Sequence, residues 1–475
     1  MTDDLIAIID IGKTNAKLSF VDAQSGETTW SMQRRCTCSE RHGIRALDVA
    51  GIERQLLDGL AEAPGKERVR AIFPVAHGAA AVLLTASGEV ITAPDYEDSA
   101  FESVGETYRR LRDSFQLTFS PFLPLGLNLG RQLYYLQQTH PELFRTCAAI
   151  LLYPQYWAWR LSSVMASEIT SLGCHSDLWR PREADFSALA KSMGWNKLLP
   201  PRRAAGDVLG TITTTVARVT GLDPTCRVLC GIHDSNASYL CYRASRPADE
   251  HFAVVSSGTW TVIMAHGGDL ERLSEGRDML ANIDAFGSPV ATARFPGGRE
   301  YEAIAGDDPL ARKPTLESLQ GVLQKRAVAL PSFAGTGGPF VGQRGKLVNA
   351  EQLDAGERGA LATLYCALQT DLLLDLLGAP SPVIIDGPLT ENPLYGPVLA
   401  TLRAAPQGTS AAAAPVFAGD NRAGPTECAR FLLGHRPATQ LRHATRLELP
   451  GLEDYRARWR VEVTSRSPID QRTSS

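Results

Sequence analysis

Two stretches of the chain share one order of apolar and polar positions. Residues 5–11 form an apolar run, a polar turn with Gly12 follows, and residues 16–20 alternate between apolar and polar. Residues 252–266 repeat this order around a turn that contains Gly258. Apolar runs of this length are typical of β-strands, and a short polar turn with glycine between two of them is typical of a hairpin. We therefore predict one hairpin near the start of each half of the chain.

Further patterns extend this interpretation to a mixed α/β protein. The apolar run at 69–75 is typical of another strand, and helical spacing dominates from about 131 to 195. In the second half, a long amphipathic helix is predicted at 349–377 and a strand at 382–386.

A segment poor in apolar residues, 242–251, separates the two halves. A chain of 475 residues is several times the usual domain size, so two domains with separate cores are expected. Because each half opens with the same hairpin pattern, we predict a duplicated α/β unit with a cleft between the copies. The predicted domains are residues 1–245 and 246–475.

Composition narrows the classes of function. The chain has 48 basic and 52 acidic side chains and a net charge of −4, which argues against nucleic acid or an anionic membrane as its main partner. The first apolar run is short, follows acidic residues and is interrupted by Asp10, and no later run reaches membrane length. We expect a cytoplasmic protein that acts on small soluble molecules.

The nine cysteines and nine histidines indicate neither a disulfide framework nor a structural metal site. The cysteines lack the paired spacing of zinc sites, and the histidines lack an HExxH or similar ligand spacing. We expect reduced thiols, most of them buried.

The first turn carries side chains that suit a nucleotide. Gly12 lets a phosphate approach the backbone N–H groups of the turn, while Lys13 and Thr14 add a charge and a hydroxyl. Asp10, at the end of the preceding strand, is placed to hold Mg²⁺ directly or through water. The alternative is a hairpin whose aspartate caps its own turn. The first turn by itself leaves both interpretations open.

The second turn changes this balance. Ser257, Gly258 and Thr259 offer backbone donors and hydroxyls from the other half of the chain. A tight turn rich in small residues would have the same composition. Two matched turns in a duplicated chain nevertheless favour the binding of a polyphosphate.

Asp234 follows a short strand-like run and precedes a helical pattern. An aspartate in this position is commonly the N-cap of the helix. It could also be a general base that takes a proton from an alcohol during attack on a phosphoryl group. The segment by itself leaves both roles open.

Four motifs in order carry a family resemblance. They are residues 10–17, residues 77–78, residues 231–237 and residues 256–260. In order and spacing they resemble the FGGY carbohydrate kinases, a family of the actin-like ATPase superfamily, over about residues 5–435. The resemblance implies two ribonuclease-H-like domains with a central cleft. It also implies phosphorylation of a sugar hydroxyl by ATP with Mg²⁺.

The resemblance also assigns roles to residues. Asp234 would be the general base, and Asp10 would hold Mg²⁺, directly or through water. The residues expected to bind ATP are Gly12, Lys13, Thr14, Asn15, Lys17, Ser257, Gly258, Thr259, Gly335, Gly387 and Asn421. The residues expected to face the sugar are His77, Gly78, Asp95, Tyr96, Asp98, His233 and Asp234.

Some of these positions depart from the family pattern. Lys13 stands where relatives usually have serine or threonine, and of the Gly-Gly-Gly run that relatives carry only Gly387 is shared. Asn421 is either a ribose or adenine contact or an ordinary turn residue. Gly335 lies in a glycine-rich loop, 330–346, that fails the phosphate-loop pattern, and we expect it near the γ-phosphate.

The motifs around His233 and Gly258 are similar to those of the branch that phosphorylates rhamnulose and fuculose. The predicted substrate is therefore a ketose or deoxyketose of the rhamnulose, fuculose, xylulose or ribulose kind. Two alternatives stay open: a catalytically altered sugar sensor on the same fold, and a polyol kinase. The expected partner is a small sugar, and the sequence leaves a homodimer open.

Overall fold

The computed structural model describes residues 4–306, 314–335, 337–378, 380–404, 414–436 and 439–466. The chain divides into two compact units, which are described separately. The first unit comprises Met1–Arg246, Ala281–Pro289 and Ala423–Ala438, and the second comprises Pro247–Leu280, Val290–Arg422 and Thr439–Ser475. The change from the first to the second unit after Arg246 falls inside the apolar-poor segment 242–251. Two later segments return to the first unit.

The first unit is built around a sheet in the order β12-β13-β6-β1-β2-β3, with β14 also paired to β6. Its strands are β1 (Leu5–Ile11), β2 (Asn15–Asp22), β3 (Thr28–Arg35), β6 (Val69–Ala76), β12 (Val208–Thr211), β13 (Arg227–Leu229) and β14 (Ile232–His233). β1 and β2 form the predicted antiparallel hairpin. β1, β13 and β14 each pair with β6 in parallel, so their carboxyl ends meet at one edge of the sheet.

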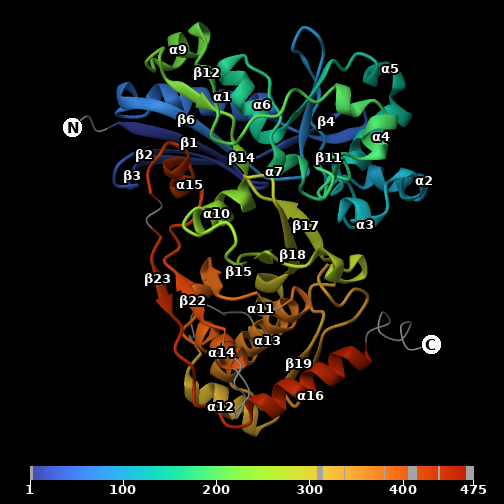
Figure 1. Ribbon diagram of the computed structural model, residues 1–475, viewed down its shortest axis with the longest axis vertical. Helices are drawn as coiled ribbons and strands as arrows, with labels where there is room; N and C mark the ends of the chain where they lie inside the picture. The colour runs from blue at the N-terminus through green and yellow to red at the C-terminus, as the bar shows by residue number, and fades with distance from the viewer. Residues whose placement is uncertain are drawn as a thin grey trace. The chain divides into compact units, whose positions relative to one another are not determined.

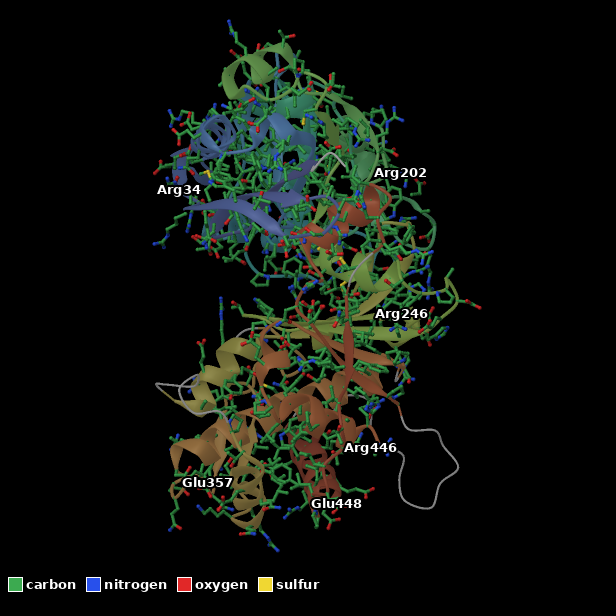
Figure 2. The ribbon with its side chains drawn as sticks, turned by 90° about the vertical axis from the view of Figure 1, so that its left-hand side faces the viewer. Arg34, Arg202, Arg246, Glu357, Arg446 and Glu448 are labelled. Carbon is green, nitrogen blue, oxygen red and sulfur yellow. The ribbon has the colours of Figure 1, made fainter. Side chains whose placement is uncertain are left out.

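Helices cover both faces of this sheet (Figure 1). On one side lie α1 (Val49–Glu62), α6 (Tyr153–Ser162) and α9 (Thr214–Thr220), and on the other lie α10 (Asp234–Arg243) and α15 (Pro425–Leu432). Apolar side chains of α1 and α6 pack with those of β1 and β2 in one core cluster, so burial of these faces holds the layers together. On the edge strand β3, Arg34 is exposed (Figure 2).

Smaller elements complete the first unit. The strands are β4 (Cys38–Arg41), β5 (Ile44–Leu47), β7 (Ala81–Leu84), β8 (Val90–Thr92), β9 (Ala149–Leu152), β10 (Trp179–Arg180) and β11 (Asp185–Phe186). The helices are α2 (Gly105–Leu111), α3 (Phe115–Thr118), α4 (Leu129–Thr139), α5 (Pro141–Phe144), α7 (Ile169–Leu172) and α8 (Ala188–Ser192). A second apolar cluster, which includes Leu83, Leu133 and Trp195, forms their core.

The second unit repeats the plan. Its sheet has the order β18-β16-β15-β21-β22-β23. The strands are β15 (Phe252–Ser256), β16 (Thr261–His266), β18 (Pro289–Phe295), β21 (Val383–Asp386), β22 (Val416–Gly419) and β23 (Leu441–His443). β15 and β16 form the second predicted hairpin, and β15, β21 and β22 are parallel neighbours. β17 (Leu280–Ile283) lies where the chain passes between units, and β19 (Val328–Leu330) pairs with β20 (Lys346–Val348).

The helices of the second unit gather around α13 (Ala355–Leu376). The others are α11 (Gly297–Ala305), α12 (Leu316–Gln324), α14 (Tyr395–Leu402) and α16 (Leu452–Ser465). The predicted start of the long helix at residue 349 is wrong, because Asp354 and Glu357 form a capping box that begins it at Ala355. Glu357 (Figure 2) also pairs with Lys325 at 2.6 Å.

α13 is also not amphipathic, since most of its residues are buried. Among the described helices, none combines the length and the apolar composition that crossing a bilayer would need. All nine cysteines lie among the described residues, none of them forms a disulfide, and seven of them are buried, as expected.

Candidate functional site

Strand register brings the site residues of the first unit together. Asp10 and Ile232 both align with Val75 of β6, so Asp10 on β1 and His233 at the end of β14 share one edge of the sheet. His77 follows β6 directly, and its backbone N–H donates to Ile11 O at 3.0 Å. Ligands of open α/β sheets bind at this carboxyl edge. Residues that the sequence places far apart therefore meet where a substrate would bind.

Asp234 is the first residue of α10, and His233 is its N-cap. The Asp234 carboxylate receives all of its described hydrogen bonds on Oδ1: from Ser235 N at 2.5 Å, from Ser235 Oγ at 3.2 Å and from His233 Nε2 at 3.2 Å. The alternative of Asp234 as N-cap is therefore wrong. Within the described residues Oδ2 receives no hydrogen bond, and the side chain is 39% exposed. One oxygen is held while the other is open to a substrate.

The ionised form of the Asp10 carboxylate is disfavoured by its surroundings. Burial and the nearby Asp234 raise its pKa from 3.8 to about 6, although Lys17 opposes this rise. Lys17 lies opposite Asp10 in the hairpin register. No hydrogen bond from the described residues reaches the Asp10 carboxylate, so it does not cap its own turn. A cation nearby would stabilise the ionised form of this carboxylate.

The donor set fits Mg²⁺ only together with substrate oxygens. Among the described residues, no cluster of three or more His, Cys, Asp or Glu side chains could hold a metal ion. Mg²⁺ commonly uses one or two carboxylates plus phosphate oxygens and water. Asp10 fits that role.

The first turn is closed by Gly12 N donating to Asn15 O at 2.9 Å, with Thr14, Asn15 and Lys17 exposed. The ammonium of Lys13 contacts Asp95 and lies 4.7 Å from the centre of the Tyr96 ring. The positive charge of Lys13 is therefore paired with the negative charge of Asp95 within the first unit.

Asp95 and Asp98 also have internal partners. Asp95 is fully buried and receives Arg45 Nε at 2.8 Å and Cys38 Sγ at 3.2 Å. Burial by itself raises the pKa of Asp95, but the Lys13 ammonium and the other donors hold it below 3.8. Asp98 accepts from Arg45 N and Ala100 N. These two carboxylates support the segment around Tyr96.

His77 and Tyr96 are packed together. The His77 ring lies 5.7 Å from Tyr96 and 5.0 Å from Tyr153, and Nδ1 is 2.8 Å from Gly78 O. Burial lowers the pKa of His77, so its imidazole is neutral at neutral pH. A Cβ at Gly78 would lie 2.8 Å from His233 Nε2, which explains glycine at this position.

In the second unit, neighbouring strand ends assemble another set. Ser256 aligns with Asp386 and Ile385 with Ala418, so the segments after β15, β21 and β22 meet. Ser257 Oγ donates to Asp386 O at 2.7 Å, and Gly387 N donates to Asn421 Oδ1 at 3.0 Å.

Gly387 is required where it stands. Its φ is +82°, and a Cβ there would collide with the carbonyl oxygen of Ser257. Gly258 and Thr259, which follow Ser257 in the chain, are exposed and can contact a ligand.

The residues that support the segment around Gly335 were not predicted from the sequence. Arg294 pairs with Asp278 at 3.0 Å and lies 5.1 Å from the Trp260 ring, and Gly338 N donates to Asp278 at 2.9 Å. Buried Glu300 accepts from Ser332 Oγ at 2.8 Å and from Phe333 N at 2.9 Å. These contacts hold the glycine-rich segment against α11 and the second hairpin. No spacing in the sequence marks them.

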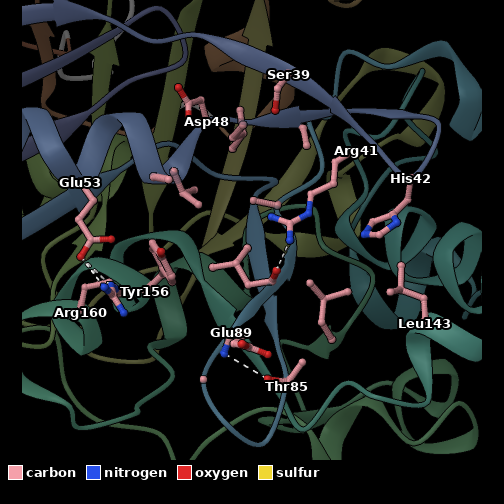
Figure 3. Close-up of a pocket in the computed structure, with 18 of the residues that line it drawn as sticks. Ser39, Arg41, His42, Asp48, Glu53, Thr85, Glu89, Leu143, Tyr156 and Arg160 are labelled. Atoms are coloured by element: carbon pink, nitrogen blue, oxygen red, sulfur yellow. Dashed lines mark hydrogen bonds and ion pairs between the residues drawn. The ribbon is translucent and has the colours of Figure 1, made fainter.

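A hollow of about 780 Å³ in the first unit is a different place. It is lined by Arg41, Glu53, Tyr156 and Arg160 among others, and Arg160 pairs with Glu53 at 2.6 Å (Figure 3). None of the predicted site residues lines it. The hollow therefore does not change the assignment of the site.

Comparisons with known proteins bear on the family to which the chain belongs. A family model described as "Carbohydrate kinase FGGY, C-terminal domain" matches residues 249–426. A solved carbohydrate kinase from Novosphingobium aromaticivorans is 37% identical, with a TM-score of 0.88 over 98% of this chain and 99% of that chain. The chain belongs to the FGGY carbohydrate kinase family. The family resemblance is confirmed, and membership indicates a sugar phosphotransferase with two actin-like ATPase domains.

Other FGGY relatives are more distant. L-fuculokinase of Salmonella typhi is 26% identical over 57% of this chain and 58% of its own length. L-fuculokinase of Escherichia coli K12 is 28% identical over 31% of this chain and 30% of its own length. These alignments thus span 58% or less of the curated relatives. Xylulose kinase from Rhodospirillum rubrum, at 17% identity and a TM-score of 0.79 over 98% of this chain and 100% of that chain, supports the fold.

Proposed function

We propose that the protein transfers the γ-phosphoryl group of ATP to a hydroxyl of a ketose or deoxyketose. In this proposal Asp234 is the general base. The observation that carries it is the division of the Asp234 carboxylate into a held Oδ1 and an Oδ2 that no described hydrogen bond occupies. A base must reach the hydroxyl proton with an oxygen that has no other partner.

Phosphoryl transfer depends mainly on positioning and on neutralised charge. The turn with Gly12 in the first unit, and the turn with Gly258 in the second, would supply N–H groups and hydroxyls to the phosphates. Asp10 would hold Mg²⁺, because its raised pKa leaves a carboxylate that a cation stabilises. When bound, the ion offsets negative charge on the phosphate oxygens. Gly387 and Asn421 would lie near the ribose or adenine.

The sugar would face His77, Tyr96 and Asp234 in the first unit. Neutral His77 and the Tyr96 ring offer hydrogen-bonding and stacking groups to a sugar. Two curated relatives are named L-fuculokinase, and this supports a deoxyketose of the fuculose kind. Nine cysteines without a disulfide fit a reducing cytoplasm.

The decisive experiment measures ADP release with ATP, Mg²⁺ and a panel of ketoses, aldoses and polyols. Asp234→Asn is expected to lower kcat by a factor of about 100 or more while ATP binding is retained. Asp223→Asn is the matched control, because Asp223 is also 39% exposed and lies in the same unit. Turnover near the wild-type rate in Asp234→Asn would reject the assignment.

The alternatives give different results in the same assay. A sugar sensor would bind one sugar without releasing ADP, and a polyol kinase would release ADP only with polyols.

A further inference from the structure

We propose that Cys174 is a positioning residue for phosphoryl transfer: its thiolate keeps His233 protonated, and the imidazolium holds Oδ1 of Asp234 so that Oδ2 faces the sugar hydroxyl. The inference rests on the proposed role of Asp234 as the base. It assigns a function to a buried thiol that the proposed reaction otherwise leaves unused.

The geometry forms a chain of contacts. Cys174 Sγ lies 3.8 Å from His233 Nε2, and the same nitrogen lies 3.2 Å from Asp234 Oδ1. Cys174 and His233 are only 3% and 5% exposed. A Cβ on Gly78 would come within 3.3 Å of Sγ and 2.8 Å of Nε2, so the strand end closes over the pair. The Cys174 sulfur, the His233 imidazole and the Asp234 carboxylate therefore contact one another in that spatial order.

Neighbouring charges explain why Cys174 and His233 are ionised. Burial raises the pKa of a thiol, as it does for Cys147 and Cys226 in the same unit, to about 11 and about 12. Cys174 has the opposite shift: burial still opposes ionisation, but His175 and His233 lower its pKa to about 5. Burial lowers the pKa of His233, yet Cys174 and Asp234 together raise it to about 9.

The same segment also fixes the backbone of His233. His233 N donates to Thr170 Oγ1 at 3.1 Å, and Thr170 Oγ1 donates to buried Glu168 at 2.5 Å. The Asn236 amide lies 3.4 Å from His233 Nδ1, and with the amide turned over, its Oδ1, which has no hydrogen-bond partner among the described residues, would accept from a protonated Nδ1. Residues 168–175 thus hold both the backbone and the charge of His233.

Several other groups influence the proton on His233. The charged groups that act on it directly are Cys174 and Glu168 around α7, His77 after β6 and Asp234 on α10. Further groups act on those neighbours: His175 on Cys174, Lys13 on His77, and Asp10, which pairs with Lys17 in the hairpin register, on Asp234. Of these, the Cys174 thiolate raises the His233 pKa most. Its removal should lower that pKa even though the other groups remain.

The test measures two quantities in wild type, Cys174→Ala and Cys174→Ser. The first is the titration midpoint of His233 by NMR in the ligand-free protein, assigned with His233→Gln. The second is the pH profile of kcat/KM with a sugar that is turned over. Cys147→Ala is the control, because Cys147 is a buried thiol of the same unit without the Cys174 shift. Cys174→Ser keeps the volume of the side chain in case the alanine variant folds poorly.

In both Cys174 variants we expect the His233 midpoint to fall by one pH unit or more and the alkaline limb of kcat/KM to move down with it. Cys147→Ala should change neither. An unchanged midpoint would overturn the ion pair, and a moved midpoint with an unchanged pH profile would overturn its role in positioning. Failure of the wild type to phosphorylate any sugar would instead overturn the proposed function, so the two failures are distinguishable.

Discussion

Asp10→Asn is expected to stabilise the ligand-free protein while it impairs the use of Mg²⁺ and ATP. Burial and Asp234 raise the pKa of Asp10 from 3.8 to about 6 in the folded protein. In the unfolded chain that pKa stays near its ordinary value. The folded state therefore holds this proton more tightly, and ionisation of Asp10 lowers the free energy of unfolding as pH rises.

The size of this effect follows from the shift. A change of about 2 pKa units at about 1.4 kcal/mol each gives about 3 kcal/mol, an upper bound for the gain from removing the charge. The gain should be absent below pH 4, grow between pH 4 and pH 6, and stay constant above pH 7. For a unit of this size it corresponds to a rise of several degrees in Tm.

The assay is thermal unfolding of both proteins between pH 4.5 and pH 8, without and with Mg²⁺ and ATP. Asp22→Asn on β2 is the matched control, because Ser25 N–H lowers the pKa of Asp22 and its ionised form stabilises the fold. That variant should lose stability above pH 4. A gain in Asp10→Asn that is equal at pH 4.5 and pH 7.5, or no gain at either pH, would refute the reasoning. Mg²⁺ with ATP should raise the Tm of the wild type more than that of Asp10→Asn.

Three further predictions concern other contacts. Gly78→Ala should lower turnover at least tenfold with little loss of Tm, because its Cβ would displace the His233 ring. Glu300→Gln should raise the KM for ATP severalfold in steady-state assays, because an amide offers fewer acceptors to the glycine-rich segment. Asp371→Asn should lower the free energy of unfolding of the second unit by about 3 kcal/mol, measured by urea denaturation, since it removes a buried carboxylate that pairs with three partly buried arginines.

Each of these has a control or a contrary result. Gly210→Ala adds a Cβ no nearer than 3.9 Å to its neighbours, so it should leave turnover unchanged. An unchanged KM for ATP in Glu300→Gln would remove the glycine-rich segment from the nucleotide site. Asp371→Asn with wild-type stability would mean that Asp375 alone satisfies the arginines.

The hairpins and the two-unit α/β plan could be predicted because they are local patterns. The apolar run and turn that form β1 and β2 occur again at β15 and β16, and strand periodicity is readable in a single sequence. The start of α13 was wrongly predicted at residue 349, although Asp354 and Glu357 have the capping-box spacing that marks it. Its burial could not be predicted, because burial depends on the helices packed around it.

Two segments late in the chain belong to the first unit, and the amino-acid composition of the sequence does not predict this. Residues 281–289 and 423–438 differ little in character from their neighbours in the chain. The contact between Cys174 and His233 joins residues 59 positions apart, and the contact between Lys13 and Asp95 joins residues 82 positions apart. Such pairs depend on the tertiary fold, which no local pattern encodes.

The two aspartates at the carboxyl edge differ through their neighbours rather than their chemistry. Asp234 has three donors on one oxygen, one of them an imidazole that the Cys174 thiolate keeps charged, so its charge is partly compensated and its second oxygen is directed. Asp10 has no described donor, and the nearby charge of Asp234 raises its pKa, so its charge is left for an ion to offset. Environments that separate two carboxylates in this way assign them different tasks. In the proposed reaction a proton acceptor and a cation ligand can therefore share one sheet edge without exchanging roles, provided that the His233 imidazolium stays with Asp234.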